Sequence, residues 1–312
     1  MLDKILDSLN FAFRQKEAIY RVGRVFTSLF DGGFSLKRVT ALFIAFFEMF
    51  SSVIFDGGST PMGQQLNLDG YKLVYCDEFN GDKLNTDDWA YRASGSRRGG
   101  FNAESQVKVE DGKLVITGEY LENGEYGPGW YVGMINLKEQ YCRGYFECRC
   151  ICNPGKDFWS AFWFQADSPY DHYISKGGVG GAELDIMESL SSEDPSPFKR
   201  GSITQTVHCN GGDDDIENID SQNVGKFKGK NIYSEYNTYG LEWTEDEYIF
   251  YVNGVETGRT SWENGVSEVP EMLIVSLEIP ENISYAADSG YKTQYLVDYV
   301  KIWQKPEDIK SR

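Results

Sequence analysis

From Tyr71 to the end of the chain, apolar and polar residues alternate in short runs that are separated by turn residues. Clear runs span Gly112–Gly118, Gly144–Cys152, Glu247–Gly254 and Tyr295–Trp303. Alternation with a period of two is typical of strands that bury one face. No helical periodicity and no internal repeat interrupts the pattern over Leu68–Glu307. This region therefore predicts an all-β fold, a two-sheet antiparallel sandwich of about 240 residues.

Two dipeptides within this region, Asp111-Gly112 and Asn253-Gly254, are pairs that favour tight β-hairpins. The pattern changes upstream, at the turn-rich residues 55–61. We therefore expect two regions, an N-terminal segment of residues 1–67 and a β domain of residues 68–312.

The N-terminal segment has a helical pattern. Apolar residues recur at helical spacing between residues 3 and 30, and residues 39–55 are almost wholly apolar around Glu48. This second run is slightly shorter than the roughly 20 residues that span a bilayer. Three interpretations stay open: a helical hairpin that packs or self-associates, a membrane-attached segment, and an export signal.

Three of the six cysteines, Cys148, Cys150 and Cys152, alternate along one expected strand. They share a face with Phe146, and their neighbours point to the other side. Consecutive Cα atoms on one face of a strand lie about 6.6 Å apart, which is a poor distance for a disulfide. We expect buried free thiols that fill the core, which weakly favours a reducing setting.

Charge excludes one class of partner. The chain has 30 Lys and Arg against 48 Asp and Glu, a net charge of −18. Such a balance argues against nucleic-acid binding, because phosphate contacts need an excess of basic side chains. Aromatic residues make up 15% of the chain, which is enough to supply flat apolar binding surfaces.

The strongest chemical signal is the run Gly180–Ser189, where three carboxylates interrupt an apolar strand. Glu183 and Asp185 are two residues apart and share a face, whereas Glu188 lies an odd number of steps away. A β-bulge at Ile186-Met187 would return Glu188 to the acidic face. The two glutamate carboxyls could then approach to about 5 Å, the separation expected of a retaining glycosidase.

Trp159 and Trp163 lie an even number of residues apart, so both can face one side of a neighbouring strand. Indole rings beside paired carboxylates suit the C–H face of a sugar ring. The alternatives are a solvated acidic sheet edge and two tryptophans that belong to the core.

The run Glu183–Glu188 resembles the catalytic signature of glycoside hydrolase family 16, in the bulged form of laminarinases and agarases. Further segments resemble the same family in the same order: Cys76–Gly81, Asn102–Gln106, Gly144–Cys150, Trp159–Trp163, Thr206–His208, Tyr239–Trp243 and Val297–Trp303. The resemblance extends from about Leu73 to Gln304 and leaves out residues 1–67.

The resemblance implies a concanavalin A-like β-jelly-roll with an open cleft, to which an N-terminal helical segment is added here. It also implies endo-acting hydrolysis of internal β-linkages with retention. Glu183 would be the nucleophile and Glu188 the general acid/base. Asp185 between them would help to keep Glu188 protonated, because neighbouring carboxylates resist a second negative charge.

The family also implies ligand residues. The substrate would contact Trp159, Trp163, His208, Asn102 and Glu104, although a purely structural imidazole at position 208 stays an alternative. Catalysis would need no cofactor. Many family members bind a structural calcium ion, and hard oxygen ligands for it would come from Glu78, Gly112 and Asp298; a hydrogen-bonded strand edge is the alternative.

Departures from the family limit the choice of substrate. Val132–Ile135 lacks the arginine that laminarinases have there, and Ser276–Asn282 lacks their Gly-Gly-x-Trp loop. A β-1,3- or mixed-linkage glucan is favoured, and a β-galactan or host glycan is the alternative. Transglycosylation and non-catalytic sugar binding also stay open. A polymeric substrate favours an extracellular or cell-surface location, whereas the free thiols favour an intracellular one.

Overall fold

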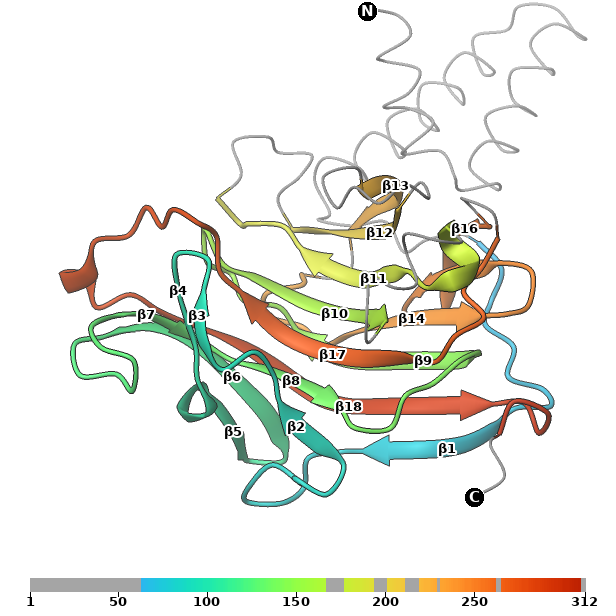
Figure 1. The fold of residues 1–312 in the computed structure, drawn as a ribbon, viewed down its shortest axis with the longest axis horizontal. Helices are drawn as coiled ribbons and strands as arrows, with labels where there is room; N and C mark the ends of the chain where they lie inside the picture. The colour runs from blue at the N-terminus through green and yellow to red at the C-terminus, as the bar shows by residue number, and fades with distance from the viewer. Residues whose placement is uncertain are drawn as a thin grey trace, which may run out of the picture.

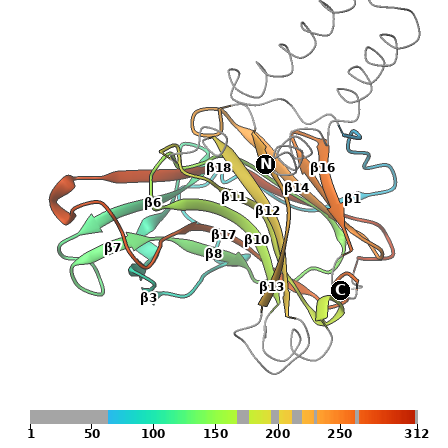
Figure 2. The same cartoon turned by 90° about the horizontal axis from the view of Figure 1, so that it is seen from above.

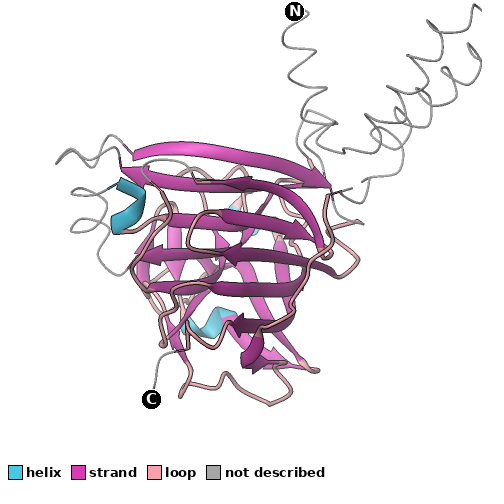
Figure 3. Ribbon diagram, turned by 90° about the vertical axis from the view of Figure 1, so that its right-hand side faces the viewer, coloured by secondary structure: helices cyan, strands magenta, loops and turns pink. Residues whose placement is uncertain are grey.

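The computed structural model describes residues 63–166, 177–193, 201–210, 219–228, 231–261 and 265–309. Within these ranges the chain forms β-strands and a few 3-10 turns, η1 (Glu104–Gln106), η2 (Gly177–Gly180) and η4 (Ala287–Ser289). Figure 3 shows how completely strands dominate this part of the chain. No helix among the described residues is long and apolar enough to cross a membrane. The predicted helices of the N-terminal segment lie outside the described residues.

The strands form two sheets that are stacked face to face (Figures 1 and 2). The larger has eleven strands, with β1 (Lys72–Asp77) paired to β18 and β5 (Val107–Glu110) paired to β6. Its main path is β16 (Val255–Thr260), β15 (Tyr248–Val252), β14 (Asn237–Trp243), β9 (Gly144–Ile151), β18 (Lys292–Gln304), β6 (Lys113–Leu121), β7 (Gly129–Val132), β4 (Gly100–Asn102) and β3 (Gly95–Arg97).

The smaller sheet has seven strands. Their order is β13 (Ile219–Lys228), β12 (Ser202–Asn210), β11 (Glu183–Ser189), β10 (Trp159–Ala166), β17 (Glu271–Glu278), β8 (Met134–Leu137) and β2 (Trp89–Tyr91). Every pairing in both sheets is antiparallel except the short parallel contact of β4 with β7. The predicted two-sheet antiparallel sandwich is therefore confirmed.

The main core lies between the sheets, where alternate residues of each strand meet. On β9, Phe146, Cys148 and Cys150 belong to this core, as does Cys152 just beyond the strand. All six cysteines are free. The predicted role of the three alternating thiols as core filler is confirmed.

Both predicted hairpin turns are present. Asp111-Gly112 joins β5 to β6 between the paired residues Glu110 and Lys113, and Asn253-Gly254 joins β15 to β16. All four turn residues have positive φ, between 51° and 73°. Positive φ at both central residues defines the type I′ turn, whose twist matches that of the flanking strands.

The outer face of the larger sheet is covered by the start of the described chain. Leu66, Leu68 and Tyr71 pack on a cluster that includes Tyr145 and Tyr251. The backbone N–H of Leu66 donates to the carbonyl of Gly254, at 2.8 Å. The chain thus already contacts the sandwich before the predicted boundary at residue 67, and Tyr145 is fully buried although it points away from the main core.

The outer face of the smaller sheet is different. A small apolar cluster there contains Trp163, Met134, Ala161 and Ile274, with Trp159 packed against it, and it is separate from the main core. Because residues alternate along each strand, the carboxylates of β11 lie on this same face.

Candidate active site

The bulge on β11 determines how its carboxylates are presented. Along β10, Phe162 pairs with Met187 and the next residue, Trp163, pairs with Asp185, so Ile186 is an extra residue. The pairing with β12 shifts at the same place, between Asp185 and Glu188. Ile186 and Met187 are both fully buried in the main core. The bulge thus places Glu183, Asp185 and Glu188 on one face of the sheet, as the odd spacing predicts.

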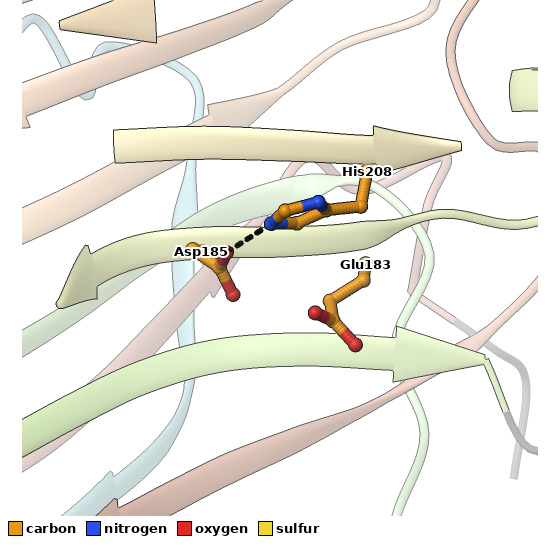
Figure 4. Close-up of side chains that lie close together, drawn as sticks. All are labelled: Glu183, Asp185 and His208. Atoms are coloured by element: carbon orange, nitrogen blue, oxygen red, sulfur yellow. Dashed lines mark hydrogen bonds and ion pairs between the residues drawn. The ribbon is translucent and has the colours of Figure 1, made fainter. Parts of the chain in front are cut away.

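Asp185 lies at the centre of this group and is only 4% exposed. Its Oδ2 atom is 2.9 Å from Nε2 of His208 on the neighbouring strand β12, and Nδ1 of His208 is 2.6 Å from Oγ of Ser221. Figure 4 shows Glu183 and Asp185 side by side beneath the imidazole. One ligand atom from each of these three residues lies within 4.8 Å of the other two.

Burial and mutual repulsion favour protonation of the carboxyl groups. Desolvation, followed by the negative charges of Glu188 and Glu183, raises the pKa of Asp185 to about 8, although the hydrogen bond from His208 opposes the shift. Desolvation also raises the pKa of Glu183 and that of Glu188. At neutral pH such a group of carboxyls cannot be fully ionised, so it holds a proton available for acid catalysis.

Two opposing effects act on the pKa of the His208 imidazole. Burial disfavours the charged form of His208, but the hydrogen bond and negative charge of Asp185 outweigh burial and raise the pKa of His208. Asp185 and His208 therefore share a proton between two neighbouring strands, and the two groups titrate together.

Each glutamate accepts a hydrogen bond from β10. Nε2 of Gln165 donates to Oε2 of Glu183 at 2.8 Å, and Nε1 of Trp159 donates to Oε1 of Glu188 at 2.8 Å. Both donors are neutral and face the same side as the carboxylates. They hold the two carboxyls in fixed orientations without adding a positive charge beside them.

The predicted substrate residues lie in two places. Trp159, Trp163 and His208 surround the carboxylates, with the indole N–H of Trp163 donating to Oγ of Ser276 at 3.1 Å. Asn102, at the end of β4, is buried and its side-chain amide has no hydrogen-bond partner among the described residues. Glu104 follows in η1 and is exposed. The role of these residues in binding substrate stays a prediction.

Several residues near the carboxylates are absent from the sequence prediction. Arg92 donates to Gln165, and Arg97 and Arg98 both donate to the buried carboxylate of Glu278 on β17. Gln165 could have been found, because it lies an even number of residues from Trp163. The three arginines could not have been found from the sequence, because only the fold brings residues 92–98 beside β10 and β17.

Donors that could bind a metal occur in two groups. Glu183, Asp185 and His208 offer two carboxylates and an imidazole, but Asp185 and His208 already contact each other directly. In the expected calcium site, Glu78 is 3.0 Å from Nζ of Lys301.

The other acidic residue of that site, Asp298, is also paired with a cation. Its carboxylate is 2.5 Å from Nη1 of Arg149. Gly112 has a positive φ in the hairpin turn. As arranged here, these residues do not fit calcium, because the ion would have to displace both Lys301 and Arg149 from the acidic ligands.

Comparison with known proteins gives a consistent result. The family model described as "Beta-porphyranase A-D, GH16 domain" matches residues 73–305. Glucan endo-1,3-beta-glucosidase A1 of Niallia circulans is 26% identical over 272 residues, which cover 76% of this chain and 38% of that protein. Beta-porphyranase D of Zobellia galactanivorans is 29% identical over 212 residues, which cover 60% of this chain and 46% of that protein. The chain thus spans less than half the length of these two relatives.

A solved structure supports the fold. The crystal structure of porphyranase B from Zobellia galactanivorans superimposes with a TM-score of 0.59 at 21% sequence identity. The match covers 75% of this chain and 92% of that one. The sandwich described above is therefore the same fold.

Proposed function

Because the chain belongs to glycoside hydrolase family 16, we propose that it is an endo-acting, retaining glycoside hydrolase of a β-linked polysaccharide. The observation that carries this proposal is the bulge of β11, which gathers Glu183, Asp185 and Glu188 on one face. Two carboxyls beside a scissile bond are what this hydrolysis requires, one to attack the sugar and one to handle the proton.

In the first step, the ionised Glu183 attacks the anomeric carbon and forms a glycosyl ester. Glu188 gives its proton to the glycosidic oxygen as that bond breaks, and the released chain leaves as an alcohol. In the second step, Glu188 removes a proton from water, whose oxygen attacks the same carbon and displaces Glu183. Two inversions give net retention.

Asp185 and His208 support the division of roles between the glutamates. The buried carboxyl of Asp185 lies beside both, and the negative charges of Glu188 and Glu183 help to raise its pKa to about 8, so the three carboxyls resist full ionisation. The proton that this group retains is available to Glu188 when Glu183 is ionised. His208 holds Asp185 by its Nε2 atom and thereby fixes its orientation.

For the substrate we propose a polysaccharide of the type cleaved by β-porphyranases, with a β-1,3- or mixed-linkage glucan as the second candidate. The matching family model favours the first, as does Met134, which stands on the outer face where laminarinases have an arginine. The endo-1,3-glucosidase relative favours the second.

Reducing-sugar release from a panel of polysaccharides tests the proposal. The panel contains porphyran, agarose, carrageenan, β-1,3-glucan and mixed-linkage glucan, and wild type is assayed beside Glu183→Ala. We expect release from porphyran that the substitution abolishes. Release from glucan instead would select the second candidate. Sugar binding with no release from any polymer would contradict hydrolysis and indicate a non-catalytic sandwich.

A further inference from the structure

The two neutral donors on β10 depend on arginines from one short segment. Gln165 and Trp159 hold the two catalytic glutamates, and each of these donors contacts an arginine that lies within residues 92–98. Arg92 directly follows β2, and Arg98 occupies the turn between β3 and β4. One segment of the chain, residues 92–98, thus contacts both of the residues that hydrogen-bond the glutamates.

Arg92 determines which way the amide of Gln165 points. Its Nη2 atom is 2.7 Å from Oε1 of Gln165. A guanidinium can only donate, so the amide oxygen must face Arg92 and the NH2 group must face Glu183. Without Arg92 the amide could rotate by half a turn and place its oxygen against the carboxylate. That orientation would lose the hydrogen bond and repel the nucleophile.

Two contacts with described residues hold Arg92 in place. Its backbone N–H donates to the carbonyl of Met134 at 2.9 Å, and Nη1 lies 3.1 Å from Sδ of Met272. Met134 and Met272 belong to β8 and β17 of the smaller sheet. The guanidinium therefore has a defined position relative to β10.

Arg98 covers the indole of Trp159. Its Cζ atom lies 5.1 Å from the ring centroid, and its Nη1 atom donates to Oε2 of Glu278 at 2.8 Å. Glu278 is also the direct cross-strand partner of Trp159, on β17. A guanidinium held between a buried carboxylate and a ring face restricts rotation of that ring. The indole N–H consequently stays directed at Glu188.

The backbone places Arg98 for this contact. Arg98 has a φ of 46°, in the left-handed region, within the turn that joins β3 to β4. The next residue, Gly99, donates its N–H to the carbonyl of Pro280 at 3.0 Å. The turn is thereby attached to the chain that follows β17, close to Glu278.

We propose that Arg92 and Arg98 are positioning residues, Arg92 acting on the nucleophile Glu183 through Gln165 and Arg98 acting on the acid/base Glu188 through Trp159. Among the described residues, Arg92 donates to Gln165 and Arg98 donates to Glu278, so each arginine acts through a residue next to a catalytic carboxyl. The roles of nucleophile and acid/base rest on the proposed function, whereas the two hydrogen-bond chains do not. Arg98 also pairs with Glu278, whose negative charge raises the pKa of both glutamates, but Glu278 keeps Arg97 as a partner when Arg98 is replaced.

The pH profile of activity distinguishes the two chains. The Gln165 hydrogen bond lowers the pKa of Glu183 against the effect of burial, and the Trp159 hydrogen bond does the same for Glu188. Weakening either bond raises the pKa of the glutamate that it holds. Glu183 must be ionised and Glu188 protonated, so Arg92→Ala should move the acid limb to higher pH and Arg98→Ala the alkaline limb.

Kinetics of Arg92→Ala, Arg92→Lys, Arg98→Ala and Arg98→Lys test the proposal. We expect each alanine variant to lose kcat by about 10-fold or more with KM little changed, and each lysine variant to recover part of the loss. Arg259→Ala is the matched control, because Arg259 pairs with Glu247 and Glu256 on the larger sheet. A rise in KM with both pH limbs unmoved would overturn the proposal, since it would indicate direct substrate contact.

A measurement without substrate separates this proposal from the proposed function. Ionisation of Glu188 should change the fluorescence of Trp159, so the difference between wild type and Trp159→Phe should titrate with pH. Arg98→Ala should move that midpoint to higher pH, and Arg259→Ala should not. An unmoved midpoint in Arg98→Ala would overturn the Arg98 role even in an active enzyme. If the midpoint moves in a protein that cleaves no polymer, the positioning role of Arg98 is supported although the proposed hydrolase function is wrong.

Discussion

Asp185 and His208 are joined across two strands by a 2.9 Å contact between Oδ2 and Nε2. Asp185 is directly opposite Thr206 on β12, and His208 is opposite Glu183, so the contact runs diagonally across the ladder. The imidazole thus lies above Glu183, the proposed nucleophile, while it contacts the carboxyl of Asp185. The protonation of Asp185 and His208 therefore depends on the pairing of β11 with β12.

The first prediction concerns pH and stability. The pKa of Asp185 rises to about 8 in the folded protein from an ordinary value near 3.8. As pH increases through this interval, the unfolded chain releases a proton that the folded chain retains, so the unfolding free energy falls.

Two other groups act in the same direction. Desolvation raises the pKa of the buried Glu271 to about 8, and the raised pKa of His208 contributes stability that is lost as pH rises through its folded value. We expect the melting temperature to fall as the pH rises from about 4 to about 8. Asp185→Asn should flatten this dependence, whereas Asp288→Asn at an exposed position should not. An equally steep dependence in Asp185→Asn would contradict the assignment.

The second prediction concerns the bulge. Deletion of Met187 would remove the extra residue, and in the regular strand that results Glu188 would lie two positions after Asp185, still on the acidic face. Part of the activity should therefore remain, although the loss of a fully buried side chain should destabilise the fold. Met187→Ala keeps the bulge and removes buried atoms. It should cost about 2–5 kcal/mol of unfolding free energy while most activity remains at low temperature. Complete loss of activity in a deletion variant that still folds, as judged by thermal unfolding, would show that the extra residue is itself required and not only the face on which Glu188 lies.

The third prediction concerns the thiols. All six cysteines are free, and four of them are buried. Thiol titration of the unfolded protein without reductant should count six groups, and added reductant should leave the melting temperature unchanged. A count of four, with a lower melting temperature on reduction, would reveal a disulfide and a different arrangement of β9.

The fourth prediction concerns calcium. Lys301 and Arg149 neutralise Glu78 and Asp298, so the charge that calcium would supply is already present. We expect chelation with EDTA to leave the melting temperature unchanged, and added calcium not to raise it. Destabilisation by EDTA that calcium reverses would show that the two cations move aside and that the site binds metal.

Local patterns predicted much of this structure. The odd spacing of Glu188 predicts the bulge, and the alternation of Cys148 and Cys150 with Phe146 predicts the core face of β9. The turn dipeptides predict both hairpins because their residues tolerate positive φ. These features depend on neighbours a few residues apart, which is why sequence alone suffices.

Contacts between distant segments could not be predicted in this way. Tyr145 alternates away from the core and should face solvent, yet the chain before β1 and Trp303 cover it completely. Likewise, Arg92 and Gln165 are 73 residues apart in sequence and meet only in the folded sheet. Their hydrogen bond has no local signature.

The stereochemistry of the first product tests the account most directly. Proton NMR follows the anomeric signals as the wild-type enzyme cleaves the polymer that the panel identifies, before mutarotation mixes them. Attack by Glu183 followed by water predicts that the β-anomer appears first and that Glu183→Ala produces neither anomer. Initial appearance of the α-anomer would mean single inversion by water, and it would contradict the assignment of Glu183 as the nucleophile.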